Sequence, residues 1–114
     1  MPHFIIHCSE KVLEQQSAKK IIDTVHDTAD STELFAKGNI KARIQSFTEY
    51  TVGGTQDDFI HIFGHIMSGR TEAQKANLSE KIITALKPLF PKIAVLSINI
   101  SDFDKATYCN HNMI

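Results

Sequence analysis

Proline directly follows Met1, at the start of a segment rich in β-branched and aromatic residues. If Met1 is removed, Pro2 carries a free secondary amine, and an unperturbed α-amine has a pKa of about 7.7 to 8.0. Partial burial and nearby cations both disfavour the ammonium, so such an amine can be neutral at pH 7 and act as a general base. If Met1 is retained, the Pro2 nitrogen is an amide without basicity, and Pro2 only begins a strand.

Three cationic side chains could bind an acidic substrate. Arg70 follows Gly69, where a predicted strand runs into a predicted helix. Backbone amides at a helix start favour an anion, and a guanidinium there could hold a carboxylate or a developing enolate oxygen. Lys41 and Arg43 share one face of another predicted strand because side chains alternate. Two cations on a sheet face suit an acidic substrate or, equally, a solvated surface, and both interpretations stay open.

Four of the six histidines form two pairs, His3 with His7 and His61 with His65, each on one face of a predicted strand. Residues four apart on a strand are too distant for one ion to bridge, and no cysteine or carboxylate cluster supports a metal site. We therefore expect no metal. Filling a subunit interface is the role we expect for these side chains.

Length and composition exclude several classes of protein. The 114 residues suffice for a single domain, 42% of them are hydrophobic, and the formal net charge is -1. A basic excess that could hold nucleic acid is lacking, and no apolar run is long enough to span a membrane. The first residues do not resemble a signal peptide. Cys8 and Cys109 are too few and too far apart for a disulfide framework, which favours a reduced, cytoplasmic protein.

Hydrophobic periodicity predicts the elements that must position these residues. Alternation predicts strands over about 2–8, 39–48, 58–67 and 93–101. Helical spacing predicts one helix over 12–29, with clean amphipathicity only from Ser17. The segment from Thr71 to Gln74 fits a capping box, and the helix it starts is limited by Pro88 and ends at Pro91. The tail, 102–114, has no clear period.

The order of elements is strand-helix-strand twice, over about 2–49 and 57–102. Two right-handed β-α-β units predict a single α+β domain over 1–114, with a four-stranded mixed sheet and two helices on one face. Both faces of the strand over 58–67 are largely apolar or aromatic, so both should be covered. The face without helices would otherwise be open, which favours an oligomer that covers it.

Two features together resemble the tautomerase superfamily: Pro2 at the start of a strand, and the segment Ser68 to Lys75, where a strand runs into Gly-Arg and a capped helix. With a length of two units, the chain resembles the 5-carboxymethyl-2-hydroxymuconate isomerase family more than the 4-oxalocrotonate tautomerase, which has a single unit. The resemblance is carried by residues 2–5, 39–44 and 58–90.

The resemblance implies a homotrimer and cofactor-free proton transfer, with Pro2 as the base and arginines that bind substrate carboxylates. By position, Arg70 is one such arginine. The family isomerase has an arginine where this chain has Lys41, followed two residues later by the equivalent of Arg43. This difference matters because an ammonium is a point charge, whereas a guanidinium is a planar fork. Tyr108 corresponds to a late aromatic residue on the wall of the 4-oxalocrotonate tautomerase site.

The sequence therefore predicts an isomerase that transfers a proton within an unsaturated 2-hydroxy or 2-oxo carboxylate. The isomerase family that this chain resembles acts in the catabolism of aromatic compounds such as homoprotocatechuate. Two alternatives stay open: a non-catalytic trimeric protein that binds an acidic metabolite or a partner, and a promiscuous phenylpyruvate-type tautomerase.

Overall fold

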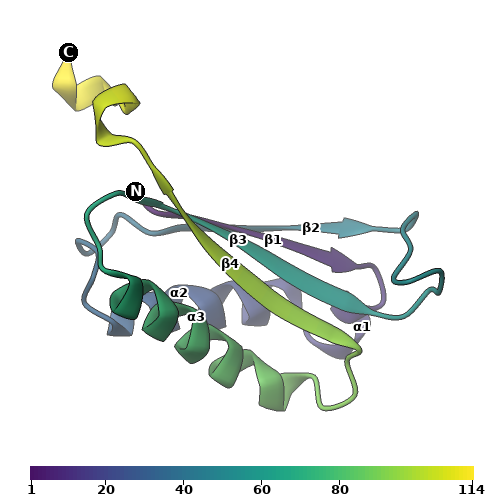
Figure 1. Cartoon of the computed structure of the whole chain (residues 1–114). Coiled ribbons are helices and arrows are strands. Elements are labelled where there is room, and N and C mark those ends of the chain that lie inside the picture. Colours follow the sequence, from purple (N-terminus) through teal and green to yellow (C-terminus); the bar gives the residue numbers. More distant parts are fainter.

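The computed structural model is a four-stranded sheet with helices packed on one face (Figure 1). Its strands, in the spatial order β2-β1-β3-β4, are β1 (His3–Ser9), β2 (Lys41–Phe47), β3 (Phe59–Met67) and β4 (Val95–Phe103). The pairs β1–β2 and β3–β4 are parallel, and the central pair β1–β3 is antiparallel. The predicted mixed sheet of two β-α-β units is thus confirmed.

The α-helices are α1 (Val12–Gln15), α2 (Ala18–Ser31) and α3 (Glu72–Leu86). The prediction of one continuous helix over 12–29 is wrong, because Gln16 is extended (φ -140°, ψ 143°) and separates α1 from α2. Ser17 caps α2, since its hydroxyl accepts the backbone N–H of Lys20 at 3.1 Å. Clean amphipathicity from Ser17 onward therefore reflects the true start of the helix. None of the helices has the length and apolar character needed to cross a membrane.

The start of α3 is the predicted capping box. The Thr71 hydroxyl accepts the Gln74 backbone N–H at 3.1 Å, and the Gln74 side chain accepts the Thr71 backbone N–H at 2.9 Å. Pro88 limits the helix, as predicted, and lies in the 3-10 turn η1 (Lys87–Leu89), but α3 already ends at Leu86 and not at the predicted Pro91. The last strand was predicted two residues early, because a turn occupies the residues before Val95. The tail forms two 3-10 turns, η2 (Lys105–Thr107) and η3 (His111–Met113).

The core lies between the sheet and the helices. Alternate residues of β1 and β3 are fully buried there against three residues from each of α2 and α3: Phe4, Ile6, Cys8, Ile60, Ile62, Ile66, Ile21, Val25, Ala29, Leu78, Ile82 and Leu86. Gly64 interrupts this pattern on β3, because an added Cβ would lie 2.5 Å from the Ile100 side chain and 3.3 Å from the Phe4 ring. Close packing therefore requires glycine at this position.

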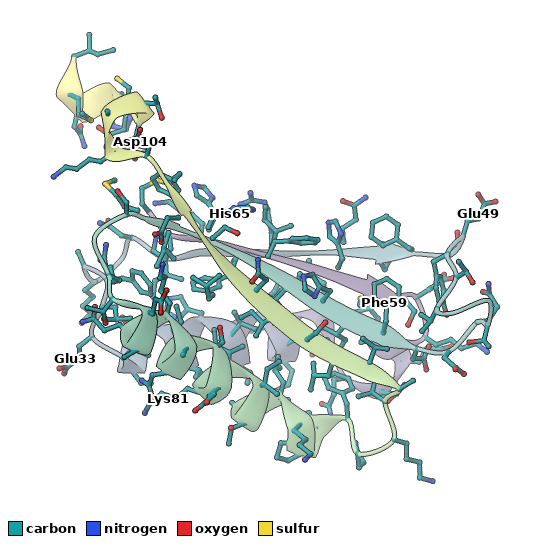
Figure 2. The ribbon with its side chains drawn as sticks, viewed as in Figure 1. Glu33, Glu49, Phe59, His65, Lys81 and Asp104 are labelled. Atoms are coloured by element: carbon teal, nitrogen blue, oxygen red, sulfur yellow. The ribbon has the colours of Figure 1, made fainter.

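The opposite face of the sheet carries no helix (Figure 1). His65 points from it away from the helices in Figure 2. The Phe63 ring contacts His61 and His7 edge-to-face, with centroid distances of 4.5 and 5.1 Å. Phe63 is nevertheless 38% exposed, so the expected covering of both faces of β3 is not met within one chain.

Candidate active site

Two adjoining cavities lie at the end of the sheet where β1 begins. The larger has a volume of about 700 Å³, and its walls include Met1, His3, Lys41, Arg70 and Tyr108. The smaller, about 290 Å³, shares three of those residues and adds Arg43 and His65, among others. The structure therefore brings the four predicted binding residues together around the chain start. Neither cavity is lined by an aspartate or a glutamate.

Pro2 is buried, and it lines neither cavity, whereas its neighbours Met1 and His3 line both. Its carbonyl accepts the backbone N–H of Lys41 at 3.0 Å, which extends the parallel ladder between β1 and β2 by one bond. This bond places Lys41 beside the chain start. With Met1 present, the Met1 amine donates to the Asn39 carbonyl at 3.3 Å, and the Pro2 nitrogen is an amide.

The surroundings of the chain start disfavour a positive charge. Burial, followed by the hydrogen bonding and charge of Lys41, lowers the pKa of the Met1 amine from 8.0 to about 6. The Lys41 ammonium donates to the Asn39 carbonyl at 2.7 Å, and the Met1 amine donates to the same oxygen. Both nitrogens therefore share one acceptor, and with a pKa of about 6 the Met1 amine is largely neutral at pH 7.

Arg70 is held in a fixed orientation at the junction of β3 and α3. Its guanidinium donates to the carbonyls of Leu34 and Met67, and it lies 5.3 Å from the centroid of the Phe35 ring. Gly69, with φ +121°, makes the turn that leads into it. Two of the five guanidinium N–H groups are engaged in this way, so the others are available to an anion in the larger cavity.

Arg43 contacts His3, a residue of β1 that lines both cavities. Its Nη1 lies 3.0 Å from His3 Nδ1. The sheet register pairs His3 with Lys41 on one side and with His65 on the other. Sequence reasoning assigned His3 to an interface and missed it as a site residue, although its position directly after Pro2 was a usable signal.

The tail after β4 forms part of the cavity wall. The Tyr108 ring packs against Phe103 with centroids 5.6 Å apart, and Asn110 Nδ2 donates to the Tyr108 hydroxyl at 3.2 Å. These contacts position the tail, which projects beyond the sheet near the N-terminus (Figure 1). Asn110, His111 and Asn112 also line the larger cavity. Sequence reasoning missed these three residues because the tail has no periodicity.

The histidines do not assemble into a metal centre. No three His, Cys, Asp or Glu side chains lie together so as to hold an ion. His61 instead bonds Ser97 across the sheet, with Nδ1 and Oγ 2.7 Å apart. Burial, with a smaller contribution from His7, lowers the pKa of His61.

Known proteins resemble the chain in both sequence and structure. The sequence profile of the family described as 5-carboxymethyl-2-hydroxymuconate isomerase matches residues 2–114. A 5-carboxymethyl-2-hydroxymuconate Delta-isomerase from Escherichia coli is 25% identical over 92 residues, which are 79% of this chain and 73% of that protein.

Two solved structures illustrate the likeness of fold. The crystal structure of a 5-carboxymethyl-2-hydroxymuconate isomerase from Deinococcus radiodurans R1 superposes with a TM-score of 0.84 at 22% identity, covering 96% of this chain and 87% of the other. A fused 4-OT described as a symmetric trimer has a TM-score of 0.79 at 13% identity, covering 96% and 94% of the two chains. The predicted resemblance is confirmed. The chain belongs to the 5-carboxymethyl-2-hydroxymuconate isomerase family, and it is an isomerase with the tautomerase fold.

Proposed function

We propose that the chain, after removal of Met1, is a cofactor-independent isomerase in which the Pro2 nitrogen is the general base. The observation that supports this is the lowered pKa, about 6, of the amine that now occupies the chain start beside Lys41. The Pro2 nitrogen is one residue further into the same buried strand end and has the same cationic neighbour. It is therefore expected to be neutral at pH 7 once it is free, as a general base must be.

The proposed reaction transfers one proton and needs no redox partner. The Pro2 lone pair accepts a proton from the substrate, and the electrons of the broken bond are delocalised into a dienolate. The pyrrolidinium then returns the proton to a different carbon. Lys41 and Arg70 bind carboxylate oxygens in the larger cavity and stabilise the intermediate, with Arg43 as a further cation in the smaller one. Tyr108 bounds both cavities.

The charge of the cavities supports a substrate with more than one carboxylate. Three cationic side chains line them, and no carboxylate does. The relatives described above are named for 5-carboxymethyl-2-hydroxymuconate, a compound of this class. We propose that this chain acts in the cytoplasm on an unsaturated 2-hydroxy or 2-oxo polycarboxylate from the catabolism of aromatic compounds.

A homotrimer is the proposed assembly. The open face of the sheet carries Phe63 and four histidines without a covering layer, and a solved relative of the same fold is described as a trimer. Other copies of the chain would bury this face.

Intact-mass measurement and a ketonisation assay test the proposal together. We expect the purified chain to lack Met1 and to ketonise a dicarboxylate dienol faster than the matching monocarboxylate dienol, as followed by ultraviolet absorbance. Retained Met1 together with an absence of turnover would contradict the proposal and favour a binding protein. Equal rates on the two dienols would contradict the polycarboxylate substrate and favour a promiscuous tautomerase.

A further inference from the structure

The contact between Arg43 and His3 determines where the imidazole carries its proton. Arg43 Nη1 lies 3.0 Å from His3 Nδ1. A guanidinium has N–H donors and no acceptor, so Nδ1 must accept through its lone pair. An imidazolium cannot accept, because both of its nitrogens carry protons. His3 is therefore the neutral tautomer with its proton on Nε2.

The groups around His3 also favour the neutral ring. Arg43 and Lys41 face it from β2, the chain-start amine lies next to it, and His65 faces it from β3. Burial is the largest cause that lowers the pKa of His3, and the charge of Arg43 is the next. No carboxylate lines the two cavities that His3 borders, so nothing offsets these effects.

The remaining polar atom of the ring has no partner within the protein. His3 Nε2 makes no hydrogen bond in the chain, while His3 lines both cavities of the site. In the sequence, His3 also immediately follows Pro2, the proposed base. A neutral N–H donor fixed beside the point of proton transfer stabilises negative charge on oxygen without first having to reorganise.

We propose that His3 is a neutral hydrogen-bond donor of the site, with Nδ1 held by Arg43 and with Nε2–H bonded to an anionic oxygen of the substrate. The substrate named in this inference rests on the proposed function, whereas the tautomer of His3 does not. Arg43 is then a positioning residue: it acts on the substrate through His3, in addition to any direct attraction of its charge.

Nitrogen-15 NMR of the full-length chain tests the tautomer independently of activity. At pH 7.5 we expect the His3 signals of a neutral ring protonated at Nε2, and in the Arg43→Met variant a mixture of both tautomers. A proton on Nδ1, an imidazolium, or a spectrum that Arg43→Met leaves unchanged would overturn the inference. If the wild-type chain turned over no dienol, the proposed function would fail, while this spectrum would still report the tautomer and the effect of Arg43.

Kinetics of three variants test the hydrogen bond to substrate. His3→Phe keeps a ring but has no donor, and we expect kcat/KM to fall about 10- to 100-fold, the range for a bond to a charged group. His3→Gln keeps an N–H near the Nε2 position and should recover part of the loss. His7→Phe is the matched control, since His7 lines neither cavity, and should retain wild-type kcat/KM. Wild-type kcat/KM in His3→Phe, or a loss accompanied by a changed oligomeric mass, would contradict the role.

Discussion

The two β-α-β units have the same strand register, but they differ in the residue that begins each unit: Pro2 in the first and Asp58 in the second. The Lys41 N–H donates to the Pro2 carbonyl at 3.0 Å, and the Val95 N–H donates to the Asp58 carbonyl at 3.4 Å. Pro2 and Asp58 therefore occupy equivalent positions, as do Lys41 and Val95. In the first unit the position is the chain start, beside a cation. In the second it is an aspartate whose carbonyl accepts the backbone N–H of an apolar residue.

The polar surroundings of the two positions differ as much as their charges. The Asp58 carboxylate accepts from the Ser9 hydroxyl at 2.9 Å and from the Gln15 side chain at 3.3 Å. Its oxygens thus have partners within the chain, whereas the chain start opens into a cavity of about 700 Å³. The fold that the two units share requires only an alternating pattern of apolar residues and the correct register between neighbouring strands. The proposed chemistry depends on the groups around the chain start, so substitutions at the two positions should affect different properties.

Replacing Pro2 should have the largest effect on activity. In Pro2→Ala the chain start becomes a primary amine without the ring that orients its lone pair. We expect kcat/KM for dienol ketonisation to fall about 10²- to 10⁴-fold, the usual contribution of a general base. Steady-state kinetics on the variant, with intact mass to verify that Met1 is absent, measures the effect.

The matched control for this variant is Pro91→Ala, which changes an exposed proline remote from the chain start. It should keep wild-type kcat/KM. Unchanged kcat/KM in Pro2→Ala would remove the base from the proposed mechanism, and the difference between the two units would then be structural only.

Lys41 should affect both substrate affinity and the pH profile. Lys41→Gln removes a carboxylate ligand, and a lost bond to a charged group lowers kcat/KM about 10- to 100-fold. The charge and hydrogen bonding of Lys41 also help to lower the pKa of the amine at the chain start. Without them that pKa rises toward 8.0, and because the base acts when neutral, the acid limb of kcat/KM should move to higher pH.

Lys41→Arg is the control, since it keeps the charge and supplies the fork expected from the family. Its acid limb should stay where it is in the wild type. A kcat/KM–pH profile with the same acid limb in Lys41→Gln would show that Lys41 does not tune the base.

The strands, their faces and the capping box were predictable because each depends on local periodicity or on a fixed residue spacing. The break at Gln16 was not, because only the Ser17 cap marks it and the residues before it also have helical character. Among the site residues, Pro2, Lys41 and Arg70 lie close to strand or helix ends, which the sequence signals directly.

His3 and the tail residues other than Tyr108 were not assigned to the site from sequence, for two different physical reasons. The role of His3 depends on a cross-strand contact with Arg43, and hence on which strands become neighbours. The tail reaches the cavity through the packing of Tyr108 on Phe103, a contact that no period predicts. Similarly, the carbonyl ligands of Arg70 come from Leu34 and Met67, of which Leu34 is 36 residues distant.

Changes to the partners of the Asp58 carboxylate should alter stability and leave catalysis intact. The buried Ser9 hydroxyl donates to Asp58 and accepts the Phe59 backbone N–H at 3.1 Å. Ser9→Ala leaves that N–H without its partner, so we expect the free energy of unfolding to fall by about 1–3 kcal/mol, as measured by urea denaturation. Gln15→Ala removes only the exposed bond to Asp58 and should cost less than about 1 kcal/mol. Both variants should keep wild-type kcat/KM at a temperature where they are folded. A selective loss of kcat/KM in Ser9→Ala would mean that the Asp58 position also contributes to the site, and the division between a reactive and a structural position would be wrong.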